Sequence, residues 1–378
     1  MNKDVLTFAK TITAADLEAH LRFLASDALE GRETGENGQK VAAEYLAAQF
    51  AKMGLKPGNH GEWFQNYELN QTKVEDMNLS FDGKESLKLG KDFVFFSNAY
   101  LAESFTAPLA FAGYGIKDGE YDNLSGLDLK GKAVLVLAGE PEKDGKSVLT
   151  GTMDQSSWSS NPKKKLEALA ETGAKIFITV VPDEEYKRFS GNPWLRHRMT
   201  GKSLRLAYLD KHKIGKIFIS ESTANRLIKK SKKTMADFRK SLAENPKVPA
   251  IDFKKNKFTL TTKGKAQTII AENVLGFLEG TDKKDEVVVL TAHYDHLGVK
   301  EGKVYNGADD DGSGVAAVIE IAEAFAKAAE AGARPRRSIL FMPVSGEEKG
   351  LLGSRYYSDH PVYALENTVC NLNIDMIG

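Results

Sequence analysis

Four short clusters of acidic and imidazole side chains lie in the last quarter of the sequence. Each cluster follows or ends a short apolar run, the pattern of a buried strand that leads into a loop. In an open α/β sheet, sites form beyond the carboxyl ends of the strands. We therefore expect the four clusters to meet at one rim of a sheet. They are residues 293–295 (HYD), 309–314 (DDDGSG), 346–348 (GEE) and 373–375 (NID).

Carboxylates gathered in this way raise one another's pKa unless a cation neutralises them. Imidazole and carboxylate ligands suit zinc, with cobalt or manganese as substitutes. Two ions about 3.5–4 Å apart need a bridging carboxylate, and Asp310 is placed to be that bridge. The residue types and their spacing thus predict most of a two-metal hydrolase site.

Each cluster taken alone has an ordinary explanation. An isolated HxD motif is often a surface turn, and a pair of glutamates is commonly solvated. The DDDGSG segment alone is compatible with a helix-capping loop or a calcium loop, although it lacks the EF-hand spacing and the bidentate glutamate of that loop. The prediction therefore depends on the joint occurrence of the four clusters at successive strand ends.

Length and composition narrow the class of protein. A chain of 378 residues is long for one domain, so two are expected. Lysine plus arginine and aspartate plus glutamate both total 52, and this zero net charge gives no indication of nucleic acid or an anionic membrane as partner. No apolar run reaches the about 18 residues of a membrane span. Cys370 is the single cysteine, expected as a buried thiol, so no intramolecular disulfide is possible.

The hydrophobic pattern also outlines the elements that would position the clusters. Two amphipathic helices, over about residues 17–24 and 41–53, are expected around a polar, glycine-rich loop. Residues 102–250 read as a separate α/β or β-rich module inserted into the first domain. The remaining expected elements are strands at 109–112, 133–137, 176–181, 217–219, 287–290, 339–342 and 369–376, and helices at 166–172, 224–243 and 313–331.

The four motifs HYDHLG, NGADDDGSG, GEEKGLLGS and NIDMIG together resemble the co-catalytic zinc aminopeptidase family, which includes secreted bacterial aminopeptidases and glutamate carboxypeptidases. The N-terminal stretch LRFLASDALEGRETGENGQKVAAEYLAAQFAKMGLKP is similar to the opening of the same catalytic domain. The segments FAGYGI and LKGKAVLVLAGEP resemble the protease-associated domain that many members carry. The resemblance extends over essentially the whole chain.

The resemblance implies a three-layer α/β/α zinc-exopeptidase fold with a mostly parallel central sheet. Residues 1–101 and 251–378 would form the catalytic domain, with its C-terminal part missing, and residues 102–250 would form an inserted β-rich protease-associated domain. His293 and Asp375 would bind the first metal, Asp310 would bridge, and Glu348 would bind the second metal.

The same resemblance implies roles for two further carboxylates. Glu347 would be the general base, and Asp295 would be the carboxylate that orients His293, since such partners fix the tautomer of a ligating ring. The family also implies a cis peptide bond between Asp310 and Asp311.

The sequence departs from the family at one point, because members have a final histidine on the second metal, downstream of the NIDMIG strand. The nearest spare histidines are His296, a weak candidate as substitute ligand, and His360, expected on the surface. The simplest interpretation is a chain truncated at its C-terminus. Such a chain would bind the second zinc weakly and would expose an edge of the sheet.

The resemblance implies a metal-dependent exopeptidase, most of all an aminopeptidase that acts on a peptide or protein substrate. A carboxypeptidase and a glutaminyl cyclase are alternatives within the same family. Cyclases use one metal, so the number of bound ions would distinguish a cyclase. A peptidase-like binding protein without activity is also open, because the last histidine ligand is absent. Residue preference and oligomeric state are not indicated. A periplasmic or secreted location is implied, although the N-terminal segment MNKDVLTFAK has no signal-peptide profile.

Overall fold

The computed structural model describes residues 3–82, 85–95, 104–192, 202–209, 215–249, 251, 253 and 257–378. The chain divides into two compact units. The first unit comprises Met1–Leu69, Arg205–Tyr208 and Thr268–Gly378, and the second comprises Asn70–Leu204 and Leu209–Gln267. All four predicted clusters belong to the first unit, which therefore positions the candidate site.

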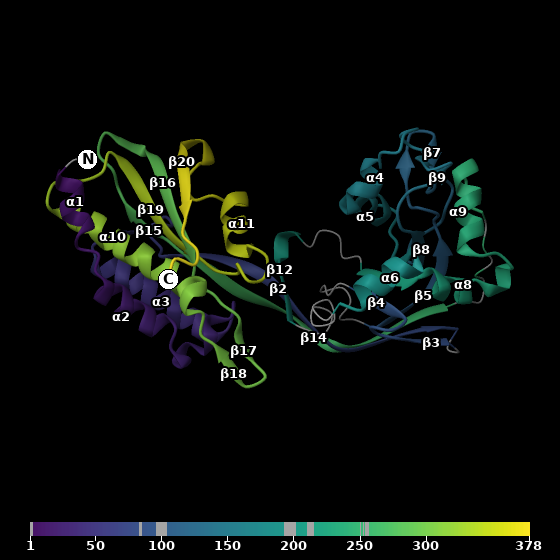
Figure 1. Cartoon of the computed structure of the whole chain (residues 1–378), viewed down its shortest axis with the longest axis horizontal. Helices are drawn as coiled ribbons and strands as arrows, with labels where there is room; N and C mark the ends of the chain where they lie inside the picture. The colour runs from purple at the N-terminus through teal and green to yellow at the C-terminus, as the bar shows by residue number, and fades with distance from the viewer. Residues whose placement is uncertain are drawn as a thin grey trace. The chain divides into compact units, whose positions relative to one another are not determined.

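The first unit is built on a five-stranded sheet in the order β1-β15-β19-β16-β20 (Figure 1). Strands β19 and β20 run parallel to β16, whereas β15 runs antiparallel to both β1 and β19. The sheet is therefore mixed, which corrects the expectation of a mostly parallel one. Residues 279–282, which connect β15 to β16, are too few for the crossover connection that would let β15 run parallel to β16. The strands are β1 (Lys56–Pro57), β15 (Gly276–Leu278), β16 (Lys283–His293), β19 (Arg337–Val344) and β20 (Thr368–Asn373).

Helices cover both faces of this sheet and make three layers (Figure 1). Leu290 and Phe341 pack in one apolar cluster with α2, α3 and α10, whereas Val289 and Leu340 pack in another with α11. Alternate residues of one strand point to opposite faces, so the continuous apolar runs of β16 and β19 are buried on both sides, as predicted. The helices are α1 (Lys3–Ala9), α2 (Ala14–Leu24), α3 (Asn37–Lys52), α10 (Gly314–Glu330) and α11 (Leu352–Asp359), with the short turns η1 (Asp27–Arg32), η5 (Ala308–Ser313) and η6 (Leu365–Asn367).

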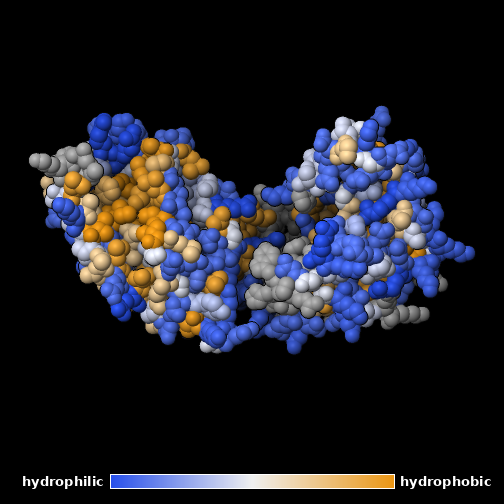
Figure 2. Space-filling view, in the orientation of Figure 1, coloured by the Kyte–Doolittle hydropathy of each residue, from blue (hydrophilic) through white to orange (hydrophobic). Residues whose placement is uncertain are grey.

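Strand β20 is the edge of this sheet, and its side chains are largely exposed. Figure 2 shows apolar residues gathered on the surface of the first unit, and the exposed apolar side chains include Val369, Leu372, Met376 and Ile377. The expectation of a buried strand with a buried thiol at Cys370 is wrong, because Cys370 is exposed. Among the described strands, β20 pairs with β16 alone, and its side chains from Val369 to Asn373 are exposed.

The second unit contains most of a larger mixed sheet in the order β12-β2-β14-β5-β8-β11-β13-β4, with β3 paired to β2. Strands β5, β8, β11 and β13 are parallel neighbours, and β8 and β11 have the predicted bounds. Strands β2 and β14 continue from one unit into the other. The strands are β2 (Phe64–Phe81), β3 (Glu85–Lys88), β4 (Phe93–Phe95), β5 (Phe105–Phe111), β8 (Ala133–Leu137), β11 (Ile176–Val181), β12 (Lys202–Leu206), β13 (Gly215–Ser220) and β14 (Lys257–Val274).

The second unit extends beyond the predicted insert of residues 102–250, because β2, β3 and β4 and part of β14 belong to its sheet. The single helix expected over residues 224–243 is two helices, since Lys232 adopts a left-handed conformation and Thr234 starts a new helix with a capping box to Asp237. The helices of this unit are α4 (Ser157–Ser160), α5 (Pro162–Ala170), α6 (Asp183–Ser190), α8 (Glu221–Leu227) and α9 (Met235–Glu244). None of the helices in the described residues is long and apolar enough to cross a bilayer.

Candidate metal centre

The strand ends of the first unit bring the four clusters together. His293 is the last residue of β16 and pairs in register with Val344 at the end of β19. On the other side of β16, Thr291 pairs with Asn373 at the end of β20. Because β16 is parallel to both neighbours, Glu347 and Asp375 leave the sheet at the same edge as His293. The predicted convergence is therefore present in the structure.

A first group of three side chains surrounds the ring of His293. Its Nε2 atom lies 3.1 Å from Oδ1 of Asp310 and 3.9 Å from Oδ1 of Asp375. One ligand atom from each of the three residues falls within 4.8 Å of the others. The peptide bond between Asp310 and Asp311 is cis, as the resemblance implied.

A second group shares Asp310 with the first. It contains Asp310, His296 and Glu348, again with ligand atoms within 4.8 Å of one another. Nδ1 of His296 lies 2.8 Å from Oε1 of Glu348. Asp310 is the residue common to both groups, which is the position that a bridging carboxylate would occupy. His360 lies outside both groups and stacks on the ring of Tyr356.

Glu347 belongs to neither group but lies beside the first. Its Oε2 atom is 4.0 Å from Nε2 of His293, and burial raises the pKa of its carboxyl. Glu347 and His293 also line a cavity of about 240 Å³ together with Asp375. A carboxylate that faces a cavity without joining a ligand group is free to exchange protons with a bound molecule.

Asp295 holds the site in a different way from the one predicted. Nδ1 of His293 contacts the backbone carbonyl of Asp295 at 3.1 Å, whereas the nearest carboxylate oxygen lies 3.9 Å away. The buried carboxylate accepts hydrogen bonds from the Thr34 hydroxyl and from the backbone N–H of Glu347. Burial raises the pKa of Asp295. Asp295 thus orients His293 through its main chain and fixes the Glu347 turn through its side chain.

Asp311 has a structural role that the sequence did not single out. Its buried carboxylate accepts hydrogen bonds from the backbone N–H groups of His293, Gly314 and Met376. These three donors belong to three of the converging segments, so Asp311 ties the segments together. A Cβ atom at Gly314 would lie 2.4 Å from Oδ1 of Asp311, and this explains why glycine opens α10. The signal for this residue in the sequence was its position next to Asp310 in the DDDGSG run.

Arg32 is a second residue that the sequence did not single out. Its side chain is 1% exposed, and it donates to the backbone carbonyls of Tyr294 at 2.8 Å, Asn306 at 2.7 Å and Gly307 at 2.9 Å, and to that of Leu24. Burial lowers the pKa of Arg32 to about 10, so the guanidinium stays charged at neutral pH. Arg32 therefore joins the HYDH turn to the loop that precedes Asp310.

We expect Arg32→Met to destabilise the chain by about 3–5 kcal/mol, because the change leaves several buried carbonyl groups without a donor. The measurement is urea-induced unfolding of the variant and the parent protein. Arg22→Met is the matched control, since Arg22 is an exposed arginine whose partner is Glu18, and its effect should stay within about 0.5 kcal/mol. A cost below about 1 kcal/mol for Arg32→Met would show that Arg32 does not hold the two loops.

The residues of the two groups suit a pair of divalent ions. Burial disfavours the imidazolium of His293, but the charges of Asp295, Asp311 and Glu347 outweigh it and raise the pKa of His293. So many carboxylates around one ring need positive charge nearby. Nδ1 of His296 and Oε1 of Glu348 are both buried and pair with each other at 2.8 Å. Two imidazoles and three carboxylates are the ligand types that zinc takes in catalytic sites.

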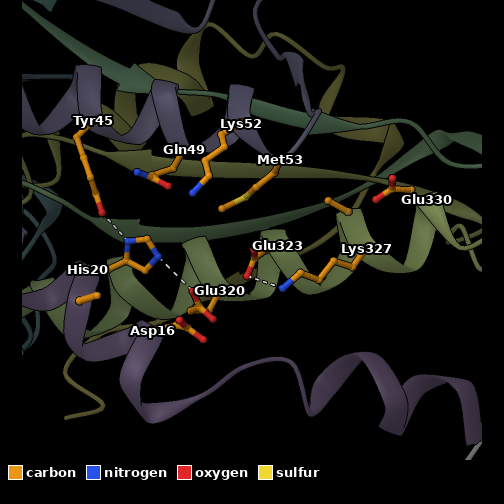
Figure 3. Close-up of a pocket in the computed structure, with 12 residues that line it drawn as sticks. Asp16, His20, Tyr45, Gln49, Lys52, Met53, Glu320, Glu323, Lys327 and Glu330 are labelled. Carbon is orange, nitrogen blue, oxygen red and sulfur yellow. Dashed lines mark hydrogen bonds and ion pairs between the residues drawn. The ribbon is translucent and has the colours of Figure 1, made fainter.

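A larger cavity, of about 470 Å³, shares no residue with the metal centre. It lies among helices α2, α3 and α10 (Figure 3). His20 projects into it, contacts the Tyr45 hydroxyl at 2.6 Å and lies 3.2 Å from Oε1 of Glu320. Glu320 is 2% exposed, and burial raises the pKa of its carboxyl to about 7. This cavity is polar but holds no cluster of metal-ligand type among the described residues.

The raised pKa of Glu320 predicts a pH-dependent stability. In the folded state the carboxyl of Glu320 keeps its proton up to about pH 7. In the unfolded state its pKa has the ordinary value of 4.5, so the carboxyl loses the proton at a lower pH. The stabilisation is therefore complete below pH 4.5 and is lost as pH rises through about 7, a change of roughly 3 kcal/mol. His20 acts in the opposite sense, since burial lowers its pKa and its contribution is lost as pH falls below 6.5.

We expect Glu320→Gln to remove this loss, so that the variant gains stability over the parent protein between pH 5 and pH 9. The measurement is the urea midpoint at both pH values, with Glu330→Gln on the same helix as control. An unchanged difference between variant and parent protein across this range would contradict the assignment.

Comparison with known proteins agrees with this geometry. Residues 273–378 match the family described as Peptidase family M28. A probable zinc metalloprotease of Leptosphaeria maculans is 36% identical over 110 residues, which cover 28% of this chain and 24% of the relative. Aminopeptidase YwaD of Bacillus subtilis is 29% identical over 141 residues, which cover 35% of this chain and 29% of the relative. A probable glutamate carboxypeptidase of Arthroderma benhamiae is 34% identical over 105 residues, which cover 28% and 14%.

A solved structure extends the likeness to nearly the whole chain. The aminopeptidase from Aneurinibacillus sp. strain AM-1 superposes with a TM-score of 0.53 over 98% of this chain and 71% of that one, at 20% identity. At this identity the likeness concerns the fold. The sequence matches themselves span less than a third of each curated relative.

The segment that carries both ligand groups is also the segment that matches a peptidase family. More particularly, residues 273–378 match peptidase family M28. The predicted resemblance to co-catalytic zinc peptidases is thereby confirmed for the segment that contains both groups.

Proposed function

We propose that this chain is a zinc-dependent exopeptidase that hydrolyses the terminal peptide bond of its substrate. Among the exopeptidases, we propose an aminopeptidase. The observation that carries the proposal is the sharing of Asp310 by two three-residue groups, each with one imidazole and two carboxylates. The first zinc would be held by His293, Asp310 and Asp375. Asp310 and Glu348 would hold the second. The aminopeptidase assignment rests on the name of the Bacillus subtilis relative.

Ions bound in these groups supply Lewis acidity and lower the pKa of water toward about 7. The residues of the chain do the remaining work. The contact between Nδ1 of His293 and the Asp295 carbonyl keeps the proton on Nδ1 and leaves the lone pair on Nε2, the atom nearest Asp310. Glu347, beside His293 and facing the cavity, accepts the proton of the attacking water and returns it to the leaving amine.

Three alternatives remain. One is a carboxypeptidase, favoured by the name of the Arthroderma benhamiae relative. Another is a glutaminyl cyclase of the same fold, which would bind one metal. A third is a peptidase-like binding protein that keeps the fold and the groups but has lost turnover. A periplasmic or secreted location and an inserted protease-associated domain are part of the proposal.

The test is hydrolysis of leucyl-p-nitroanilide, with and without a chelator and with zinc added back. N-acetylleucyl-p-nitroanilide is the matched substrate, because it lacks the free amine. An aminopeptidase cleaves the first compound alone, and the activity disappears with the chelator and returns with zinc. Release of C-terminal residues from a peptide whose N-terminus is blocked would favour the carboxypeptidase. Cyclisation of an N-terminal glutamine would favour the cyclase, and no turnover of any of these substrates would favour the binding protein.

A further inference from the structure

We propose that the cavity among helices α2, α3 and α10 binds a small alkylammonium compound, with the ammonium group against the carboxylate of Glu320 (Figure 3). This inference goes beyond the proposed function, because the cavity shares no residue with the metal centre. Its volume of about 470 Å³ is that of a small-molecule site. The charged residues that line it are four carboxylates, Asp16, Glu320, Glu323 and Glu330, and two lysines, Lys52 and Lys327.

Glu320 has a buried acceptor atom without a donor. Its side chain is 2% exposed, and its Oε1 atom lies 3.2 Å from Nε2 of His20. The other oxygen, Oε2, is buried and has no hydrogen-bond partner in the part of the chain that the structure describes. Buried polar atoms are normally paired, because an unpaired one destabilises the folded state. The cavity that Glu320 lines is the place from which a bound molecule would supply the donor.

His20 and Tyr45 use their own donors in a chain of hydrogen bonds that ends at Oε1 of Glu320. Nδ1 of His20 lies 2.6 Å from the Tyr45 hydroxyl. Burial lowers the pKa of His20, so at neutral pH the ring is neutral and carries a single N–H. When Nε2 donates this N–H to Oε1, Nδ1 accepts the O–H of Tyr45. Neither side chain then has a donor left for Oε2.

The charges near Glu320 favour a cation. Burial raises the pKa of Glu320 and lowers that of His20, and beyond this effect the carboxylates of Glu323 and Asp16 raise both pKa values. The two lysines act in the opposite sense, but Lys327 is already paired with Glu323 at 2.9 Å. Among the described residues, no group of three metal-ligand side chains lines this cavity, so we expect an organic cation rather than a metal ion.

An ammonium group meets both requirements of this end of the cavity. It has N–H donors for Oε2 and a positive charge for the carboxylates, and hydrogen bonds between charged groups are stronger than those between neutral ones. A water molecule would supply a donor without the charge. Met53 and Ala326 also line the cavity and offer apolar surface to an alkyl chain. Figure 3 shows Met53 between the end with His20 and the end with Glu330.

The test is isothermal titration calorimetry of the full chain with butylammonium, the charged end of a lysine side chain, which stays protonated below its pKa of about 10.4. We expect binding at pH 8 and about tenfold weaker binding at pH 6, because Glu320, with a pKa of about 7, loses its charge over this range. Glu320→Gln should weaken binding at pH 8 at least about tenfold and remove the pH dependence. Glu330→Gln, about 15 Å further along α10, is the matched control and should stay within about twofold.

Two further controls separate the cavity from other places where an amine binds. Butyrate and 1-butanol have the same chain length without the ammonium group and should bind at least about tenfold more weakly. An amine also binds to metal ions, so Asp310→Asn, a change at the metal centre, should bind butylammonium at the cavity with the affinity of the parent protein.

Equal affinity of the parent protein at pH 6 and pH 8 would overturn the proposal, and this comparison decides the question even if Glu320→Gln does not fold. Unchanged binding by Glu320→Gln, or a parent protein that binds no butylammonium, would overturn it as well. All three results would leave the proposed function standing. Loss of binding in Asp310→Asn but not in Glu320→Gln would place the amine at the metal centre instead.

Discussion

Glu347→Gln should reduce the turnover of a peptide substrate by roughly 100- to 10,000-fold while the zinc content stays the same. This size is typical for the loss of a general acid–base group. The glutamine has the same shape but cannot take a proton from water. Glu347 lies 4.0 Å from His293 and belongs to neither ligand group, so its charge is not needed to hold an ion. The measurement is kcat beside the zinc content of the same preparation.

The control for this prediction is Glu44→Gln, an exposed position in the middle of α3. It should change neither quantity. Loss of zinc from Glu347→Gln would assign Glu347 to the ligands rather than to proton transfer. Activity within about threefold of the parent protein would remove it from the reaction.

Asp310→Asn should abolish the binding of both ions, the largest effect expected of any single change to the site. The other ligands belong to one group each, whereas Asp310 belongs to both. A neutral amide is a poor bridge between two cations. We therefore expect the affinity for both ions to fall by at least about 1,000-fold and activity to disappear, as measured by zinc titration and by kcat.

The matched control is the neighbouring Asp309→Asn. Asp309 accepts hydrogen bonds from the Ser313 hydroxyl and the backbone N–H of Gly378, which an asparagine oxygen can also accept. This variant should keep both ions. If Asp310→Asn lost only one ion, Asp310 would be a ligand of a single metal, and the two groups would not share it.

The strands and helices next to the site could be predicted from the sequence because their patterns are local. A continuous apolar run gave β16, and the spacing of Val315, Val318 and Ala322 gave α10. An exposed edge of the sheet was expected, but that β20 is the exposed strand could not be predicted, since an apolar run has the same composition whether or not another element covers the strand. The antiparallel direction of β15 was also not visible, because it depends on which strand β15 pairs with.

The ligand candidates could be predicted because a motif places each of them at a strand end. The residues that support them could not. Arg32 and Asp311 act on backbone groups of distant segments, and backbone groups have no signature in the sequence. Asp295 could be predicted as the partner of His293, but the contacting atom could not. The turn brings the backbone carbonyl of Asp295, and not its carboxylate, to the imidazole ring. The direction of the His296 ring depends on its packing against Gly307.

The central claim is that two divalent ions neutralise the carboxylates that converge on His293. The most direct test is to strip the chain with a chelator, add zinc stepwise, and record both the bound equivalents and the unfolding temperature. Ligands that bind the folded state alone raise the unfolding temperature. We expect two zinc ions to bind per chain and the unfolding temperature to rise with them. A chain that binds no zinc, and whose unfolding temperature does not change, would contradict it.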